Sequence, residues 1–366
     1  MKPPSAVSVA PAVSVIVPCR DEVRFIEGCL DSILAADYPV ERLEIIVADG
    51  RSEDGTRQVL AAYTEKDARV RWIDNPERIT PVGLNRALDA ARGEVILRLD
   101  AHAQMAPDYV SKCVAALEST GAANVGGVRI ERAQDSGWFA DAIVAALTCR
   151  FGVGNADYRF AANRGRWVDT VFGGCWRREI FERVGKFDPR LVRSQDIEFN
   201  QRLRRAGGKI WMAPEAVTYY YTRSRLGAFV RHNWTNGIWS VLPFAYCEGT
   251  PVRLRHLAPL GLVFSTVVLA AASLLSSGVF RWAPALTLAP YAVANLAASM
   301  DLSLKRRSAK LLILLPVTFV CLHFPYGAGS LWGAIRVAAI GIGRTLTRRT
   351  LTRMSGRNEE VVPANL

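Results

Sequence analysis

The sequence predicts an α/β domain with a mostly parallel sheet, followed by an apolar region of membrane-spanning helices. Over roughly the first 250 residues, short apolar runs typical of buried strands alternate with stretches of helical periodicity. Polar residues follow several of these runs, at the strand ends where open α/β sheets bind their ligands. Beyond residue 256, three long stretches carry almost no charge, and each is long enough to cross a bilayer.

The first part of the domain is expected to contain four strands. These strands are 13–17, 44–48, 69–73 and 94–99. Residues of helical period lie between them, at 25–34 and in a second helix that Thr80 caps, Pro81 starts and Gly93 ends. Strands that alternate with helices of this length pair in parallel through right-handed crossovers. The polar residues that follow the strands are therefore expected at one edge of the sheet: Arg20, Glu22, Asp49 and Asp100.

The second part of the domain has a less regular pattern. A helix from Pro107 to Thr120 is expected to end at Gly121 and to lead into a strand near 123–130. Ser194 is expected to cap a later helix, 195–203. The remaining expected elements are an apolar helix at 138–151, a short strand at 168–174 with a glycine pair, a helix at 176–184 and a strand at 217–222.

The most informative stretch runs from Val95 to His102. It is an apolar strand with one arginine, Arg98, that ends at Asp100, and His102 follows two positions later. A carboxylate and an imidazole this close together can share one divalent cation. Taken alone, the pair is equally typical of a helix-capping aspartate beside a solvated histidine. An arginine in a buried strand is unusual, and it indicates contact with either a phosphate or a carboxylate.

Composition and charge indicate a reducing compartment beside a membrane. The formal net charge of +12 comes largely from arginines near the apolar stretches, which suits an anionic membrane surface and does not indicate nucleic acid. Residues 1–13 contain no apolar run of the signal-peptide type, so we expect the N-terminal domain to stay in the cytoplasm. The seven cysteines show neither metal-ligand spacing nor a compact disulfide pattern.

Five segments of this chain resemble the motifs of family 2 inverting glycosyltransferases, which have the GT-A fold. In chain order they are VSVIVPCRDE, VADGRSEDGT, LRLDAH, VDTVFGG and RSQDIEFNQRLRRAGGKIW. Each segment alone is a weak signal, but five in the family's order and spacing are specific. The resemblance covers roughly residues 13–240. With its apolar C-terminal part, the chain is similar to the ExoA-like glucosyltransferases of succinoglycan synthesis, which are membrane-bound bacterial enzymes of exopolysaccharide assembly.

The resemblance implies a role for each matched residue on the donor side. Such enzymes hold the uracil and ribose of a nucleotide sugar at the positions of Pro18, Arg20, Glu22 and Asp49. Asp100 and His102 fall on the Asp-x-Asp motif, which binds Mg²⁺ or Mn²⁺ and the diphosphate of the nucleotide sugar. Histidine in place of the second aspartate departs from this motif, and imidazole suits Mn²⁺ better than Mg²⁺.

On the acceptor side, the resemblance makes Asp196 the catalytic base. Gln195 stands before it where the family usually has glutamate. In the first turn of a helix, Asp196 would stay ionised, as a base must, although the same position also suits an ordinary helix-terminal acid. Gly173 and Gly174 would let the backbone approach the acceptor or the transferred sugar.

The implied activity is the metal-dependent transfer of a hexose, with UDP-glucose as the expected donor and a polyprenyl-diphosphate-linked oligosaccharide as the acceptor. A sugar nucleotide already carries a good leaving group, so the reaction needs a metal on the diphosphate and one carboxylate to deprotonate the acceptor. A processive polysaccharide synthase is the alternative among enzymes, but the chain lacks the Gln-x-x-Arg-Trp motif of such synthases. A non-catalytic, nucleotide-sugar-binding scaffold of an export complex is the alternative outside enzymes.

The apolar stretches predict a membrane region at 257–343. They are 257–280, 282–300 and 310–335. Basic residues on both sides of the first two, which include Arg253 and Arg255, place both ends of that hairpin in the cytoplasm. A single crossing by the third stretch would put the basic tail, 344–366, outside, so a re-entrant or split segment near Pro325 and Gly327 is expected instead. The chain is thus expected to be a multi-pass protein of the bacterial inner membrane, with its catalytic domain, 1–222, in the cytoplasm.

Residues 223–256 are expected to form an amphipathic helix and a linker at the membrane surface. Apolar residues that include Trp234 share one broad helical face, and Arg231 lies toward its side. Tryptophan is enriched at the level of lipid headgroups. The hypothesis is that this helix docks on the membrane and that Arg231 binds a diphosphate of the lipid acceptor. Alternatively, its aromatic residues pack in the core of the domain.

Overall fold

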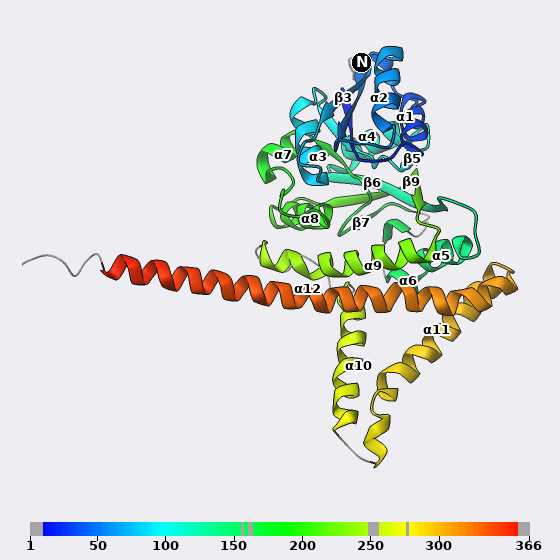
Figure 1. Ribbon diagram of the computed structural model, residues 1–366. Coiled ribbons are helices and arrows are strands. Elements are labelled where there is room, and N and C mark those ends of the chain that lie inside the picture. Colours follow the sequence, from blue (N-terminus) through cyan, green and yellow to red (C-terminus); the bar gives the residue numbers. More distant parts are fainter. Residues whose placement is uncertain (1–9, 155–156, 160–163, 248–255, 276–277, 358–366) are drawn as a thin grey trace, which may run out of the picture. The chain divides into compact units, whose positions relative to one another are not determined.

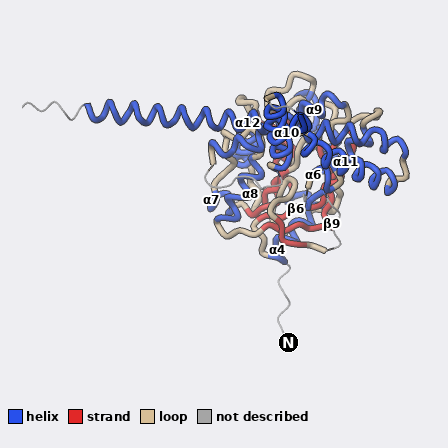
Figure 2. Tube along the Cα trace, turned by 90° about the horizontal axis from the view of Figure 1, so that it is seen from below, coloured by secondary structure: helices blue, strands red, loops and turns tan. Residues whose placement is uncertain are grey.

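The structure is a computed structural model that describes residues 10–154, 157–159, 164–247, 256–275 and 278–357 (Figure 1). The chain divides into two compact units. The first consists of Met1–Ala228 with Ala297–Phe319, and the second of Phe229–Leu296 with Val320–Leu366. The described strands all belong to the first unit, where they form one sheet (Figure 2).

Among the described residues, the sheet has nine strands in the order β3-β2-β1-β4-β8-β6-β9-β5, with β7 paired to β9. The strands are β1 (Val13–Cys19), β2 (Leu43–Asp49), β3 (Val70–Asp74), β4 (Val95–Arg98), β5 (Ala103–Met105), β6 (Asn124–Ala133), β7 (Arg166–Val168), β8 (Cys175–Arg177) and β9 (Ile210–Thr222). Strands β1 to β4 pair in parallel, as do β6 and β9. The expected α/β class with its parallel strands is confirmed, whereas β8, β5 and β7 add antiparallel pairs that the pattern did not predict.

Helices cover both faces of this sheet. One apolar cluster holds residues of α1 (Ile26–Leu34), α2 (Thr56–Lys66) and α4 (Tyr109–Thr120), and the other holds residues of α3 (Thr80–Ala90), α7 (Glu179–Val184) and α8 (Gln195–Arg205). Val15 and Val17 of β1 belong to the first cluster, and Ile16 between them belongs to the second. Because successive strand residues point to opposite faces, a strand covered on both sides is apolar throughout. Each such buried side chain contributes about 1.5–3 kcal/mol.

Three expected elements differ from the structure in the second part of the domain. The apolar helix expected at 138–151 is two helices, α5 (Ala140–Leu147) and α6 (Arg150–Val153). The helix expected at 176–184 begins only at Glu179, because Trp176 belongs to β8 and lies opposite Ile96 of β4. The strand expected at 168–174 is β7, which ends at Val168. The ring of Trp176 packs between aromatic rings of the core, so a strand residue produced the apolar signal attributed to a helix.

The C-terminal helices are α9 (Leu226–Val241), α10 (Ala258–Leu274), α11 (Ala285–Lys305) and α12 (Ala309–Arg357). Among the described residues, one helix is long and apolar enough to cross a membrane, namely Ala309–Gly341 of α12, with a mean hydropathy of 1.8. α10 has 17 residues, or about 25 Å at 1.5 Å per residue, which is shorter than a hydrocarbon core of about 30 Å. Two crossings at 257–280 and 282–300 therefore stay a prediction.

The third apolar stretch differs from its expected form. α12 continues as one helix through Pro325 and Gly327, so the bend or split expected there is corrected to an unbroken helix. The expected span, 310–335, lies in the N-terminal part of α12, and the C-terminal part of the helix extends into the expected tail, 344–366. Arg253, Arg255 and residues 358–366, on which the predicted orientation partly depends, lie outside the described residues.

Within the second unit, α9 and α12 pack closely through small residues. A Cβ atom on Gly237 would lie 2.0 Å from the carbonyl oxygen of Tyr326, and one on Gly329 would lie 2.1 Å from that of Trp234. Small residues let helix backbones approach in this way, as they do in pairs of membrane helices. Any larger side chain at Gly237 would force the two helices apart.

The buried face of α9 adds a contact that the amphipathic pattern did not predict. It consists of small and polar residues together with Phe229 and Val241: Phe229, Asn233, Gly237, Ser240 and Val241. Trp234, expected on the face that docks on the membrane, is 40% exposed. The hydrophobic pattern did not show the contact with α12 because that contact depends on small size and not on apolar surface. The exposure of Trp234 also excludes the alternative that its ring packs in the domain core.

Candidate active site

Asp100 and His102 lie in the turn between β4 and β5. β4 lies inside the sheet, and the turn at its carboxyl end is closed by the N–H of Ala103, which donates to the carbonyl of Asp100 (2.9 Å). β5 then pairs antiparallel with β9, with Ala103 opposite Tyr220. This register brings the Tyr220 hydroxyl to His102 from a strand that is distant in the sequence.

Both ring nitrogens of His102 have protein partners. Nδ1 lies 2.8 Å from Oε1 of Glu22, and Nε2 lies 2.7 Å from the hydroxyl oxygen of Tyr220. Burial alone would lower the pKa of His102, but Tyr220, the hydrogen bond and charge of Glu22, and the charge of Asp100 together raise it to about 10. In this arrangement His102 is an imidazolium at neutral pH that donates from both nitrogens.

Arg98 contacts the carboxylate of Asp100, which resolves the question of why an arginine lies in a buried strand. Its Nε and Nη2 donate to Oδ1 of Asp100 at 3.1 and 2.9 Å, and the residue is only 6% exposed. Burial opposes ionisation of Asp100, but the charges of Arg98 and His102 lower its pKa below the usual value, so it is a carboxylate. Arg98 Nη1 is buried and has no hydrogen-bond partner among the described residues. This N–H therefore has a free hydrogen-bonding capacity, which a ligand would satisfy only if a neighbouring group moved to admit it.

These residues fit a divalent cation that is shared with a bound diphosphate. Among the described residues, no group of three or more His, Cys, Asp or Glu side chains could hold a metal alone. Asp100 Oδ1 is used by Arg98, whereas Oδ2 has no hydrogen bond within the described part of the chain. One carboxylate with substrate phosphates is a common Mg²⁺ environment. His102 could join as a ligand only if its ring replaced the contact with Glu22 or Tyr220.

Asp196 lies in the first turn of α8, after Ser194 in a left-handed conformation (φ 62°). Its Oδ1 accepts a hydrogen bond from the N–H of Ile197 (2.9 Å). The carboxylates of Asp100 and Asp196 both raise the pKa of Arg98 against the effect of its burial, so both acids lie within electrostatic range of one guanidinium. The predicted base and the predicted metal ligand are thus brought into one site.

The neighbouring polar residues on α8 are less able than Asp196 to act as the base. Glu198 is tied to Arg202 by hydrogen bonds of 2.8 Å to both Nε and Nη2, so it is a poor substitute for the base. Gln195 is 6% exposed, and its Oε1 is buried without a hydrogen-bond partner among the described residues. An unpaired buried acceptor is costly, and a substrate hydroxyl at this position would satisfy it.

Close packing requires glycine at positions 173 and 174, in addition to the role predicted for Gly173 and Gly174. Their φ angles are 66° and 121°, which favour glycine. A Cβ atom on Gly173 would lie 2.6 Å from the carbonyl oxygen of Arg98, and one on Gly174 would lie 2.2 Å from the ring of Trp176. The carbonyl of Gly174 accepts a hydrogen bond from the N–H of Arg98 (2.9 Å). The glycine pair therefore allows this segment to lie directly against β4, beside Arg98.

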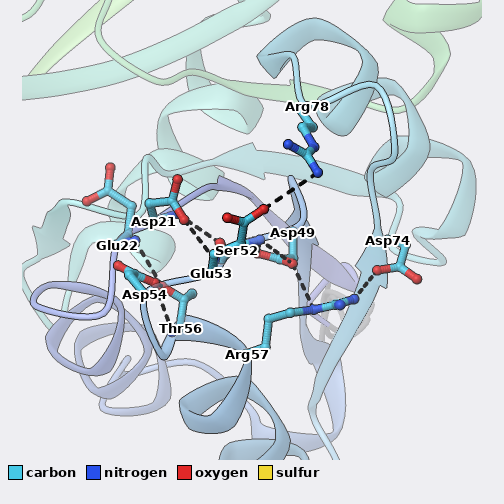
Figure 3. A network of polar contacts seen from close by, with 10 residues as sticks. All are labelled: Asp21, Glu22, Asp49, Ser52, Glu53, Asp54, Thr56, Arg57, Asp74 and Arg78. Atoms are coloured by element: carbon cyan, nitrogen blue, oxygen red, sulfur yellow. Dashed lines mark hydrogen bonds and ion pairs between the residues drawn. The ribbon is translucent and has the colours of Figure 1, made fainter.

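The loops after β1 and β2 form the nucleotide side of the predicted site (Figure 3). Asp49 ends β2 fully buried, accepts hydrogen bonds from N (3.2 Å) and Oγ (2.5 Å) of Ser52, and pairs with Nε of Arg57 (3.1 Å). Arg57 also lies over the ring of Trp72 at 4.8 Å and pairs with Asp74. Since Asp49 has no exposed surface, a direct contact with a nucleotide requires Ser52 or Arg57 to move.

The other residues predicted for the nucleotide lie at the same edge. In the β1–β2 register, Pro18 pairs with Ala48, and the N–H of Glu22 then donates to Oγ1 of Thr56 (2.9 Å). Asp21 and Arg51, which follow Arg20 and Gly50, have positive φ angles of 52° and 55°. Non-glycine residues in this region are strained and cluster at functional sites. The structure thus brings Pro18, Arg20, Glu22 and Asp49 together.

Two buried charges on β6 were not predicted as part of the site. Arg129 and Glu131 are 7% and 5% exposed and pair with each other, and Arg159 pairs with Glu131 as well. The guanidinium carbon of Arg129 lies 4.2 Å from the ring centroid of Tyr220, which connects the pair to His102. Alternate positions of a strand share a face. The sequence feature that could have revealed this pair is the alternation of two charged residues, Arg129 and Glu131, around the apolar Ile130. In the structure the two charged side chains point inward, and Ile130 is 41% exposed.

Comparison with known proteins finds a family model and similar curated proteins. Residues 14–185 match the family model described as Glycosyl transferase family 2. The chain is similar to the succinoglycan biosynthesis protein ExoA of Rhizobium meliloti, with 29% identity over 250 residues that cover 63% of this chain and 74% of that protein. It is 27% identical over 233 residues to the dolichyl N-acetyl-alpha-D-glucosaminyl phosphate 3-beta-D-2,3-diacetamido-2,3-dideoxy-beta-D-glucuronosyltransferase of Methanococcus voltae, which covers 62% of this chain and 71% of that enzyme.

Among the solved structures that are similar, a mannosyltransferase shares the fold over most of its length. It is the mannosyltransferase PcManGT from Pyrobaculum calidifontis in complex with GDP-Man and Mn²⁺. The TM-score is 0.57 at 23% sequence identity, and the match covers 89% of this chain and 88% of that one.

Proposed function

We propose that this chain, a glycosyltransferase of family 2, moves a hexose from a UDP-sugar to a lipid-linked saccharide at a membrane surface. The observation that carries the proposal is that Asp100 contacts the buried Arg98 while Asp196 lies within electrostatic range of the same guanidinium. This arrangement supplies a carboxylate for a metal–diphosphate complex and a second carboxylate for the acceptor at one edge of the sheet. The loops that carry Pro18, Arg20, Glu22 and Asp49 lie at the same edge and would hold the nucleotide.

In the proposed reaction, the acceptor hydroxyl oxygen bonds to the anomeric carbon as the bond between that carbon and UDP breaks. The hydroxyl proton passes to Asp196, and UDP leaves with the bonding electrons, so one displacement inverts the anomeric centre. Mn²⁺ or Mg²⁺, held by Asp100 and the diphosphate, would neutralise charge on the leaving group. The unpaired Nη1 of Arg98 would donate to the same diphosphate. Gln195, Gly173 and Gly174 would contact the sugar or acceptor beside the base.

The relatives support the choice of substrates without identifying them. One is named for succinoglycan biosynthesis, and another is named for a dolichyl-linked sugar phosphate as its substrate. A solved neighbour contains Mn²⁺ with a nucleotide sugar. From these similarities we propose that this chain acts in an exopolysaccharide pathway and uses a polyprenyl-diphosphate-linked acceptor. We propose UDP-glucose as its donor and Mn²⁺ as its preferred ion.

We further propose the organisation that such an acceptor requires. Residues 1–222 form the catalytic domain in the cytoplasm of a bacterial cell, and 223–256 contain α9 and a linker at the inner membrane. Residues 257–343 lie in the membrane, and 344–366 form the basic tail. Support comes from the apolar part of α12, Ala309–Gly341, and from the exposed Trp234 and Arg231 of α9.

Arg231→Ala is expected to raise the KM for the lipid-linked acceptor about tenfold, because the exposed guanidinium would lose a charge-assisted contact with the acceptor diphosphate. The KM for the UDP-sugar and the unfolding temperature should stay unchanged. Arg225→Ala removes another exposed arginine just before the same helix and serves as the control. Equal effects of the two variants would show that Arg231 contributes only a general electrostatic attraction to the membrane. Unchanged kinetics in Arg231→Ala would refute its contact with the acceptor diphosphate.

The purified chain, incubated with a panel of nucleotide sugars and polyprenyl-diphosphate-linked saccharides, tests the proposed function. We expect one sugar to be added per acceptor and slow hydrolysis of the same donor when no acceptor is present. A ladder of polymer products would indicate a processive synthase. Donor binding without hydrolysis or transfer would indicate a scaffold.

A further inference from the structure

The first unit contains a cavity away from the candidate active site, between the end of β6 and the start of α5. Its volume is about 750 Å³, and it is lined by residues 133–138, the first turn of α5 and Lys310 of α12. Binding sites for small molecules have volumes of roughly 300–1,000 Å³. None of the residues that line the cavity belongs to the donor or catalytic residues described above.

A nearly uncovered tryptophan dominates this cavity. Trp138 is 77% exposed, and Nζ of Lys310 lies 5.9 Å from its ring centroid. Gly137, its neighbour, has open space where a side chain would lie. A large aromatic ring left in water forgoes the stabilisation that burial would give, so its exposure at a concave site indicates a ligand or a membrane.

The charged residues that line the cavity are two acids and one lysine. Asp141 lies 3.8 Å from Lys310, and Asp135 pairs with Arg24 at 2.5 Å; the hydrogen bond from Arg24 and the charges of Arg24 and Arg225 lower the pKa of Asp135 and keep it ionised. Two carboxylates with one cation in the lining disfavour a diphosphate or another multiply charged anion. The carboxylates and Lys310 can accept from and donate to hydroxyl groups. An apolar ring face with hydrogen-bonding groups of both kinds suits an uncharged polyhydroxy ligand, namely a saccharide.

The cavity lies close to the transfer site along the chain. Arg24 contacts Asp135 at the cavity, whereas Glu22, two residues earlier, contacts His102 beside Asp100. Two residues span at most about 7 Å. Lys310 stands at the start of the apolar part of α12, so a ligand in the cavity would lie near the water-exposed end of that helix. A saccharide attached to a membrane lipid would be presented at that level.

We propose that this cavity binds the saccharide of the lipid-linked acceptor, with a sugar ring on Trp138 and its hydroxyls on Asp141 and Lys310. The proposal rests on the proposed function, because it assigns the acceptor's sugar to a second place in the same enzyme. The cavity holds the sugars that precede the attacking hydroxyl and thereby selects which lipid-linked saccharide is extended.

Trp138→Ala tests this assignment in the full chain, with the panel member that the wild type extends. We expect the acceptor KM to rise at least about tenfold, as for an aromatic residue at the centre of a contact, while the donor KM and donor hydrolysis without acceptor stay unchanged. Trp138→Phe keeps a ring and should restore most of the affinity. Asp141→Asn should also raise the acceptor KM. Trp282→Ala, which removes an equally exposed indole (76%) in the second unit, should not.

Three other outcomes would overturn the assignment. An unchanged acceptor KM in Trp138→Ala would show that the sugar lies elsewhere. A parallel loss of flotation with anionic vesicles that contain no acceptor would make Trp138 a membrane anchor. A wild type that hydrolyses the donor but extends no lipid-linked saccharide would remove this acceptor class, and with it the assignment. A wild type with neither activity would instead refute the proposed function itself.

Discussion

Asp196→Asn is expected to slow sugar transfer by about 10²- to 10⁴-fold, because the substitution keeps the shape of the side chain and removes its ability to accept a proton. Binding of the UDP-sugar should change little, since the proposed donor residues lie on other loops. Single-turnover transfer and equilibrium binding of the donor, measured on the same preparation, separate the two effects.

Glu198→Gln is the matched control for Asp196→Asn, because it changes a second acid of the same helix turn in the same way. Glu198 is tied to Arg202, so its loss should cost stability and not the chemical step. A lower unfolding temperature with nearly normal transfer is expected for this control. Near-normal transfer by Asp196→Asn, with a large loss in Glu198→Gln, would move the base to Glu198.

Asp100→Asn is expected to lower kcat/KM by about 10³-fold and to weaken binding of the UDP-sugar, because Asp100 would hold the metal that neutralises the diphosphate. The wild type should lose activity in excess chelator and regain it with Mn²⁺ at least as well as with Mg²⁺. Donor binding, transfer and metal titration on both proteins check this. Full activity of the wild type in excess chelator would refute the requirement for a divalent cation.

The variant Asp100→Asn also leaves the buried Arg98 without its nearest carboxylate. Breaking a buried ion pair costs roughly 3–5 kcal/mol of stability by itself. The double variant Arg98→Gln, Asp100→Asn removes both charges. It should recover the unfolding temperature but not the transfer. Recovery of activity in the double variant would show that Asp100 acts only as the partner of Arg98.

The sequence predicts the centre of the fold well, because its strands are buried on both faces. β1, β2 and β4 are mostly apolar for that reason, and the polar residues at and after their carboxyl ends stand out. Asp100 and Asp49 were found by this contrast. The helix around Asp196 was predicted from the residues at its ends, and α8 begins after Ser194 as expected.

The parts that the sequence did not predict depend on contacts between distant segments. β8 is three residues long and is defined by its pairing with β4, which no local pattern shows. The buried pair Arg129 and Glu131 looks like an exposed strand until its partner Arg159 is in place. The contact of α9 with α12 was not predicted, because Gly237 and Ser240 meet that helix through their small size. The partners of His102 likewise come from distant segments, Glu22 from the loop after β1 and Tyr220 from β9.

The configuration of the new glycosidic bond tests the single displacement by an acceptor activated at Asp196. It is read by NMR from the coupling at the anomeric carbon after transfer from a UDP-sugar of known configuration. We predict a product of the opposite configuration, because the acceptor oxygen attacks the face opposite to UDP. A product that retains the donor's configuration would contradict this mechanism, since retention through a second displacement needs a nucleophile that Asp196, as a base, does not provide.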